Sequence, residues 1–245
     1  MLTKNQAKLV KSLSEKKNRV ETGLFLVEGA KSVLELLNSD FEIDLMLATD
    51  EFFAQYEEKI RNRSKEFEIV KQDELEKLGT LETNDSALAV VKQKANAAPE
   101  TKNTGIILAL DEVKDPGNLG TIIRIADWYG IKHIVASRNT VDFYNPKVVA
   151  ASKGSFTRVN MFYTDLKEFL PKTKLPIFGA FLHGENIHET NFPTHGILLM
   201  GNESNGVNSD LEKFVTQKIT IPSYGKAESL NVAIATAVIL DNWRR

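Results

Sequence analysis

The chain has 245 residues, of which 42% are hydrophobic and 26% charged, so it can bury a core in one large domain or two ordinary ones. Its net charge of −2 argues against a protein that coats nucleic acid indiscriminately, and no apolar stretch is long enough to cross a bilayer. Cysteine is absent and the four histidines lack metal-site spacing, so we expect a cytoplasmic protein with neither a membrane nor a metal partner.

The first predicted element is a helix that begins at Thr3, because Thr3 and Gln6 form a capping-box pattern. Leucines fall on one side of this helix and lysines on the opposite side. Residues 1–20 carry a single acid, Glu15, against these basic side chains: Lys4, Lys8, Lys11, Lys16, Lys17 and Arg19. Taken alone, such a charge stripe is best explained as a solvated face; if the protein has an RNA-binding surface, that surface begins here. The predicted RNA contacts are Lys4, Lys8, Lys11 and Arg19.

The rest of the N-terminal part alternates between strand and helix patterns. In chain order, periodicity predicts a strand at 24–27, a helix at 30–37, a strand at 43–47, a helix around 52–60, and strands at 67–70 and 87–91. Together these elements make a small α/β domain of residues 1–95, which is an ordinary domain size. The segment 93–104 is polar, contains Pro99 and lacks periodicity, so it is the predicted linker.

Beyond the linker, short apolar runs alternate with helical patterns. The predicted strands are 106–110, 133–136, 177–182, 197–200 and 218–221. The predicted helices are 119–129, 146–153, 210–215 and 230–243. Alternation of this kind is typical of a parallel sheet covered by helices on both faces, so residues 104–245 are expected to form a second α/β domain.

Three polar, glycine-rich loops follow predicted strands of this second domain, at 115–120, 201–206 and 221–231. In parallel α/β sheets, ligands bind at the loops that leave the carboxyl ends of strands, so the three loops are expected to share a pocket. The second loop has the glycine spacing of a P-loop, but Val207 and Asn208 stand where lysine and serine or threonine are needed. The sequence also lacks a G-x-G-x-x-G motif, so a nucleotide-binding α/β protein is excluded.

Single side chains near these loops have a structural as well as a functional explanation. Arg124 lies six positions beyond Asn118, roughly two helical turns, so both can face the same side of a helix. An arginine among apolar neighbours is costly to bury alone, so a salt bridge to Asp127 or Asp111 is the alternative to a functional role. Ser229 is expected to cap the last helix.

Three motifs stand in register across the second domain: Asn118-x-Gly120-x-x-x-Arg124, Met200-Gly201-Asn202-Glu203, and Ile221-Pro222 followed by Ser229-Leu230-Asn231-Val232. In order and spacing, these motifs resemble the three signature motifs of the SpoU (TrmH-type) methyltransferases of the SPOUT superfamily, over residues 104–245. Less specifically, the stretch 19–37 resembles the ribosomal-protein-like substrate-binding domain that is often fused to this family.

The resemblance implies an S-adenosylmethionine-dependent RNA methyltransferase that acts on a ribose 2′-hydroxyl. It implies a homodimer whose active site borrows residues across the interface. It also implies that the C-terminal parallel-sheet domain is threaded into a deep trefoil knot, although protein chains are generally unknotted. The front domain favours ribosomal RNA, because tRNA-modifying relatives often lack it. Methylation of tRNA ribose and a catalytically idle RNA-binding protein of the same fold are the alternatives.

The resemblance also assigns roles to single residues. The expected cofactor contacts are Phe181, Met200, Gly201, Ile221 and Leu230. Gly201 suits this role because a missing Cβ lets the backbone approach a ligand closely. Arg124 is the expected catalytic residue; a guanidinium is essentially always protonated, so it is expected to grip the RNA phosphate and stabilise the transition state. The residues expected to orient the ribose or to brace the cofactor loop are Asn118, Ser229, Asn231 and Glu203.

Overall fold

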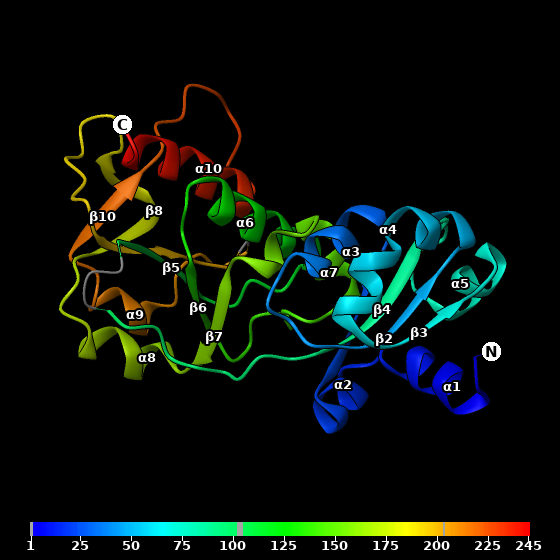
Figure 1. Ribbon diagram of the computed structural model, residues 1–245. Coiled ribbons are helices and arrows are strands. Elements are labelled where there is room, and N and C mark those ends of the chain that lie inside the picture. Colours follow the sequence, from blue (N-terminus) through cyan, green and yellow to red (C-terminus); the bar gives the residue numbers. More distant parts are fainter. Residues whose placement is uncertain (1, 102–104, 203) are drawn as a thin grey trace. The chain divides into compact units, whose positions relative to one another are not determined.

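The computed structural model describes residues 2–101, 105–202 and 204–245, which fall into two compact units (Figure 1). The described residues of Met1–Ala95 form the first unit together with Asp142–Thr157. The second unit combines Asn96–Val141 with Arg158–Arg245. This division differs from the domain boundaries expected from the sequence, 1–95 and 104–245, because the segment Asp142–Thr157 packs with the N-terminal residues.

The first unit is built on a four-stranded sheet with the strand order β1-β4-β2-β3, in which only β2 and β3 run parallel. Its strands are β1 (Leu24–Glu28), β2 (Ile43–Ala48), β3 (Ser64–Ile69) and β4 (Ala87–Lys92). Its helices are α1 (Lys4–Ser12), α2 (Lys16–Thr22), α3 (Ala30–Leu37), α4 (Asp50–Arg63), α5 (Gln72–Leu78), α7 (Pro146–Ser152) and the short η1 (Ser155–Thr157). The expected small α/β domain is therefore present, with α7 and η1 added from later in the chain.

Helix α1 begins where the capping box predicts. The Thr3 backbone N–H donates to Gln6 Oε1 at 2.9 Å, and the Gln6 N–H donates to Thr3 Oγ1 at 3.2 Å. On its inner side, Val10 and the following Leu13 are fully buried in the core cluster of this unit. The lysines of the other side are all exposed: Lys4, Lys8 and Lys11. The predicted apolar and basic sides of this helix are confirmed.

Arg19, on α2, is one of the largest fully buried side chains in the described part of the protein, with 1% of its surface exposed. Its Nε and Nη2 donate to Asp142 Oδ2 at 3.0 and 2.7 Å, and its Nη1 donates to the carbonyl oxygens of Leu13 and Ser14. A charge of this kind is buried only when it is paired and hydrogen-bonded. The prediction that Arg19 contacts RNA is therefore wrong: its guanidinium fastens α2 to the segment that returns to this unit.

The second unit is built on a six-stranded sheet in which all strands are parallel, in the order β10-β8-β9-β5-β6-β7. Its strands are β5 (Ile106–Leu110), β6 (His133–Ser137), β7 (Asn160–Thr164), β8 (Ile177–Asn186), β9 (Gly196–Met200) and β10 (Gln217–Thr220). Its helices are α6 (Pro116–Trp128), α8 (Leu166–Phe169), η2 (Leu170–Lys172), α9 (Ser209–Glu212) and α10 (Val232–Trp243).

Helices cover both faces of this parallel sheet, as the alternating pattern predicts. On one face, Leu166 of α8 and Leu211 of α9 are buried in one cluster with Ile107 and Leu199 of the central strands. Figure 1 shows α6 and α10 on the opposite face, where they pack against each other. None of the helices in the described ranges is long and apolar enough to cross a membrane.

One of the two edge strands of this sheet, β7, is hydrogen-bonded by a side chain from outside the sheet. The Asn96 side chain donates from Nδ2 to the Tyr163 carbonyl oxygen at 2.9 Å, and its Oδ1 accepts from the Tyr163 N–H at 2.8 Å. A primary amide that makes both bonds reproduces what the backbone of a neighbouring strand offers. Asn96 thus extends the sheet by the equivalent of a single residue.

Candidate active site

The loops that are expected to share a pocket leave the carboxyl ends of strands in one parallel sheet. β5 and β9 are neighbours, and Leu110 pairs with Met200 at the last position of both strands. The loop that begins at Gly201 therefore starts beside the loop that begins at Asp111. β10, which precedes the third loop, is joined to β9 through β8. The sheet order brings the starts of these loops to the edge where ligands bind in parallel α/β folds.

The 201–208 loop turns back sharply on itself. The Asn202 N–H donates to the Gly206 carbonyl oxygen and the Gly206 N–H donates to the Asn202 carbonyl oxygen, both at 2.9 Å. A Cβ atom on Gly201 would overlap the backbone of Gly206 and Val207, so only glycine fits. The backbone that closely approaches Gly201 is that of Gly206 and Val207 in the same loop. The contact of Gly201 with a cofactor stays a prediction. Glu203 lies outside the described residues, so its predicted role stays untested.

Asn231 joins the third motif to the first. Its Oδ1 accepts from the backbone N–H of Ala233 at 2.9 Å and of Ile234 at 3.3 Å, which makes Asn231 the N-cap of α10. Its Nδ2 donates to Asn118 Oδ1 at 2.9 Å. The expectation that Ser229 caps the last helix is wrong, because α10 begins at Val232 and Ser229 lies exposed before it. Asn231, a residue type that is a poor helix former but a good N-cap, is the cap itself.

Substituting Asn231 by alanine is expected to lower the free energy of unfolding by about 1 kcal/mol, because two N–H groups of α10 lose their acceptor. Asn231→Ser keeps a capping oxygen but lacks the amide that reaches Asn118, so it should retain most of the stability and lose only the link between the motifs. Urea unfolding of both variants measures this, and Ser229→Ala is the matched control with no expected change. Equal losses for Asn231→Ala and Ser229→Ala would contradict the capping role.

Arg124 lies on α6 with its side chain exposed. Within the described residues it has no ion-pair partner, and both acids that offered a structural explanation are engaged elsewhere. Asp127 pairs with Arg158 at 2.8 Å, and Asp111 accepts from the Asn208 N–H. Six residues turn an α-helix by about 600°, so Arg124 points about 120° away from Asn118, and the expectation that both face one side is wrong. No described residue of this chain therefore forms an ion pair with the guanidinium.

The residues expected to contact the cofactor lie on adjacent strands and in the segment after β10. Met200 is buried at the end of β9, and Phe181 is half-buried in β8 with the Lys218 ammonium 5.0 Å from its ring centroid. Ile221 follows β10 directly and is half-buried, whereas Leu230 is 50% exposed. Apolar side chains at strand ends suit a ligand with an aromatic base. The cofactor contacts themselves stay a prediction.

Asp111 is a carboxylate at this edge whose hydrogen bond to the 201–208 loop is not predicted from the sequence. It is 5% exposed, its Oδ2 accepts from the Asn208 N–H at 2.9 Å, and burial raises the pKa of its carboxyl above the ordinary value. An acid placed directly after a fully buried parallel strand is the sequence signal that marks it. Across the described ranges, no group of three or more His, Cys, Asp or Glu side chains is arranged to hold a metal ion.

Comparison with known proteins connects this geometry to a family. Residues 105–241 match the model of the SpoU rRNA Methylase family, and residues 4–89 match the MRM3-like substrate binding domain. The chain is similar to the 23S rRNA (guanosine(2553)-2'-O)-methyltransferase RlmP of Bacillus subtilis, with 30% identity over 238 residues that cover 96% of this chain and 94% of RlmP.

Two solved structures are similar over almost the whole chain. One, from Porphyromonas gingivalis and assigned to the TrmH family, has a TM-score of 0.89 and 34% identity. The match covers 99% of this chain and 98% of the Porphyromonas gingivalis chain. The other, an AdoMet-bound rRNA methyltransferase from Sinorhizobium meliloti, has a TM-score of 0.87 and 28% identity and covers 100% of this chain and 95% of its own. The family model spans more than half of the sequence and includes all three motifs, so the chain belongs to the SpoU rRNA methylase family.

Proposed function

We propose that this chain is an S-adenosylmethionine-dependent methyltransferase that modifies a ribose 2′-hydroxyl in ribosomal RNA. The Bacillus subtilis relative is named a 23S rRNA 2'-O-methyltransferase, and the Sinorhizobium meliloti relative is an AdoMet-bound rRNA methyltransferase. The observation that carries the proposal is the bond between Asn118 and Asn231, which are 113 positions apart in the sequence. This bond links the third motif to the first motif, which lies on α6 together with the exposed Arg124.

The proposed cofactor site is the edge formed by the ends of β8, β9 and β10. Backbone groups of Gly201, Ile221 and Leu230 would bind the adenosine part, and Met200 and Phe181 would line the pocket around its base. The buried Met200 and the half-buried Phe181 and Ile221 fit this task because they offer apolar surface beside strand ends. The bound cofactor supplies an electrophilic methyl group on a sulfonium.

Arg124 is the proposed catalytic residue. Its exposed guanidinium offers N–H donors and no acceptor, so it acts as a fixed positive charge rather than as a base. Its planar fork suits two bonds to a phosphate of the RNA, which would hold the neighbouring ribose in line for attack. Asn118, Ser229 and Asn231 would orient the ribose by hydrogen bonds, and Glu203 would brace the cofactor loop.

The same helix supports a homodimer. Trp128 lies four positions after Arg124, so both lie on one face of α6, and Trp128 is 84% exposed. On the neighbouring α10, Ile234 is 52% exposed. Large apolar side chains exposed on two packed helices are typical of an interaction surface. A second copy of the chain that covers α6 and α10 would bury Trp128 and carry Arg124 to the partner subunit's cofactor loop.

Introducing a charge at this surface by Trp128→Glu is expected to convert a dimer into a monomer, because a buried unpaired carboxylate is costly. Sedimentation velocity at micromolar concentration measures the mass directly. Val20→Glu is the matched control, since Val20 is an apolar residue of α2 with 71% of its surface exposed. If wild-type protein sediments as a monomer, or if Trp128→Glu stays dimeric, the proposed interface is wrong.

The exposed lysines of α1 would bind the phosphates of a structured RNA: Lys4, Lys8 and Lys11. We propose residues 1–95 as the RNA substrate-binding domain and residues 104–245 as the methyltransferase domain. The deep trefoil knot of this superfamily is proposed for the second of these, and the cytoplasm is the proposed location.

Methyl transfer to defined RNAs tests the proposal. Purified protein with radiolabelled S-adenosylmethionine is expected to label 23S rRNA transcripts, and mapping of 2′-O-methyl groups should find a single ribose. Labelling of tRNA and not of 23S rRNA would show that the substrate is tRNA. Calorimetry supplies the second arm: absence of S-adenosylmethionine binding would identify an idle RNA-binding protein and overturn the enzymatic proposal.

A further inference from the structure

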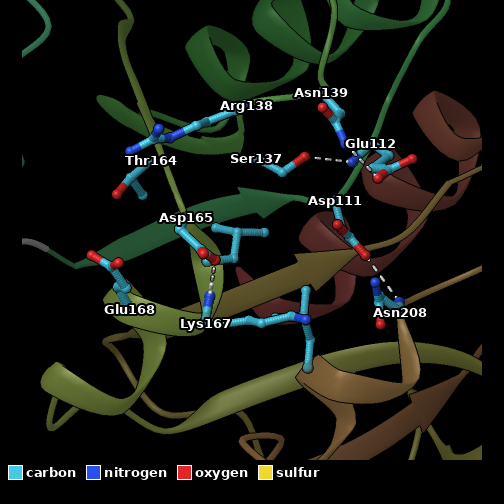
Figure 2. A pocket seen from close by; sticks show the side chains of 12 residues that line it. Asp111, Glu112, Ser137, Arg138, Asn139, Thr164, Asp165, Lys167, Glu168 and Asn208 are labelled. Atoms are coloured by element: carbon cyan, nitrogen blue, oxygen red, sulfur yellow. Dashed lines mark hydrogen bonds between the residues drawn. The ribbon is translucent and has the colours of Figure 1, made fainter.

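Two consecutive residues directly after β5, Asp111 and Glu112, hydrogen-bond to the 201–208 loop near both of its ends. Near the start of the loop, Asn202 Nδ2 donates to the Glu112 carbonyl oxygen at 2.8 Å. At its end, the Asn208 N–H donates to Asp111 Oδ2 at 2.9 Å, the bond drawn in Figure 2. The Asp111 N–H also donates to the Met200 carbonyl oxygen at 2.9 Å, directly before the loop. The Asp111–Glu112 turn thus bridges the two ends of the loop.

The backbone of Glu112 is held in a conformation that non-glycine residues rarely adopt, with φ at 55°. Its N–H donates to Ser137 Oγ and its Oε1 accepts from Asn139 Nδ2, both at 2.8 Å. Such a conformation is strained and persists where surrounding hydrogen bonds determine it. Here it coincides with the bond from the Glu112 carbonyl oxygen to Asn202. Residues at and after the end of β6 therefore hold the Asp111–Glu112 turn, and this turn holds the 201–208 loop.

Val207 anchors the loop by packing in the core cluster of this unit, but the next residue, Asn208, borders a cavity. A polar cavity of about 420 Å³ lies beside Asp111 and Asn208 at the ends of β5, β6 and β7 (Figure 2). The cavity is bounded farther away by Lys167, which is paired with Asp210, and by the exposed Glu168. Where such a space replaces packed atoms, directional hydrogen bonds are what fix the position of a backbone segment.

We propose that Asp111 is a positioning residue for the cofactor site: its carboxylate oxygen holds the returning end of the 201–208 loop, so that Gly201 and Asn202 keep their place. This rests on the proposed function, in which that loop binds S-adenosylmethionine. What Asp111 supplies is an acceptor at one point, and not a charge. An asparagine side chain offers the same acceptor without the desolvation that a buried carboxylate requires.

The variants Asp111→Ala and Asp111→Asn test this directly. Asp111→Ala is expected to raise the calorimetric Kd and the KM for S-adenosylmethionine about tenfold, with kcat at saturation within twofold of wild type. Asp111→Asn should stay within twofold in all three quantities. Glu168→Ala is the matched control, because it removes a carboxylate from the same cavity without touching the loop. Wild-type affinity in Asp111→Ala, or equal losses in the alanine and asparagine variants, would overturn the proposal.

A second pair of variants removes the donor in place of the acceptor, in case Asp111→Ala does not fold. Asn208 has φ at −56°, which proline accepts, so Asn208→Pro deletes the N–H that Asp111 binds. Asn208→Ala retains that N–H and removes only the side-chain cap of α9. A tenfold weaker cofactor affinity of the proline variant relative to the alanine variant is expected. Equal affinities of the two would contradict the positioning role.

Hydrogen exchange separates this inference from the proposed function. In cofactor-free protein, the amides of Gly206 and Asn208 are expected to exchange at least tenfold faster in Asp111→Ala than in wild type, and at the wild-type rate in Asp111→Asn. Failure of wild-type protein to bind S-adenosylmethionine would overturn the proposed function alone. Unchanged exchange in Asp111→Ala would overturn the role of Asp111, whatever the loop binds.

Discussion

Alanine in place of Arg124 is expected to slow methyl transfer at saturating RNA by at least about a hundredfold, the usual loss when one preorganised charge is removed from a transition state. The side chain is exposed and has no ion pair within the described ranges, so stability and cofactor affinity should stay at wild-type values. Single-turnover incorporation of a radiolabelled methyl group, measured beside the calorimetric Kd for S-adenosylmethionine, separates chemistry from binding.

Two further variants define what the guanidinium does. Arg124→Lys keeps the positive charge but lacks the planar fork, so an intermediate rate is expected. Arg138→Ala is the matched control, because Arg138 is also an exposed arginine of the second unit and lines the cavity beside Asp111. Normal turnover of Arg124→Ala at saturating RNA would contradict a catalytic role. If a high RNA concentration fully restores the rate of Arg124→Ala, Arg124 only binds phosphate and has no role in the chemical step.

Removing the carboxylate that pairs with Arg19 is expected to lower the free energy of unfolding by about 3–5 kcal/mol in Asp142→Ala. The Arg19 side chain is 2% exposed, and without Asp142 it keeps only the carbonyl oxygens of Leu13 and Ser14 as partners. A buried guanidinium without a counter-charge is a large loss for a protein whose total stability is on the order of 10 kcal/mol. Urea unfolding followed by circular dichroism measures the change.

An exposed ion pair of the same helix provides the control. Glu21 lies 3.8 Å from the Lys17 ammonium, and both side chains are mostly exposed. Glu21→Ala is therefore expected to change stability by less than about 1 kcal/mol. Arg19→Met, which replaces the charge by an apolar chain of similar length, should be less destabilising than Asp142→Ala. If Asp142→Ala unfolds at the same urea concentration as Glu21→Ala, burial of the Arg19 pair does not stabilise the first unit.

The strands of the six-stranded sheet are predictable from sequence where both faces are covered. Every residue of β5 is buried, and the predicted bounds of 106–110 are those of the structure. β7, from Asn160 to Thr164, is not predicted. It is an edge strand whose residues are half-buried or exposed, so it has neither an unbroken apolar run nor clean alternation. Hydrophobic periodicity reflects burial, and residues at the edge of a sheet are less buried, so an edge strand is harder to predict.

The features that sequence patterns do not show are those fixed by distant partners. α2 has no side-chain cap and exposes its apolar Val20, so its own residues predict no helix; Arg19 holds it through Asp142, 123 positions away. Asn231 caps α10 where the pattern favours Ser229, and its amide meets Asn118 from the other end of the domain. The motif residues themselves are recognisable from type and spacing, but the partner of each is set by the fold.

The amide of Asn96 has a consequence for solubility. An edge strand normally presents unpaired N–H and C=O groups, which another chain can use to start an intermolecular sheet. In β7 the backbone groups of the central Tyr163 are already satisfied by this side chain, so a strand approaching from another molecule meets no free pair at that point. A single asparagine outside the sheet thereby blocks intermolecular strand pairing at this position of β7.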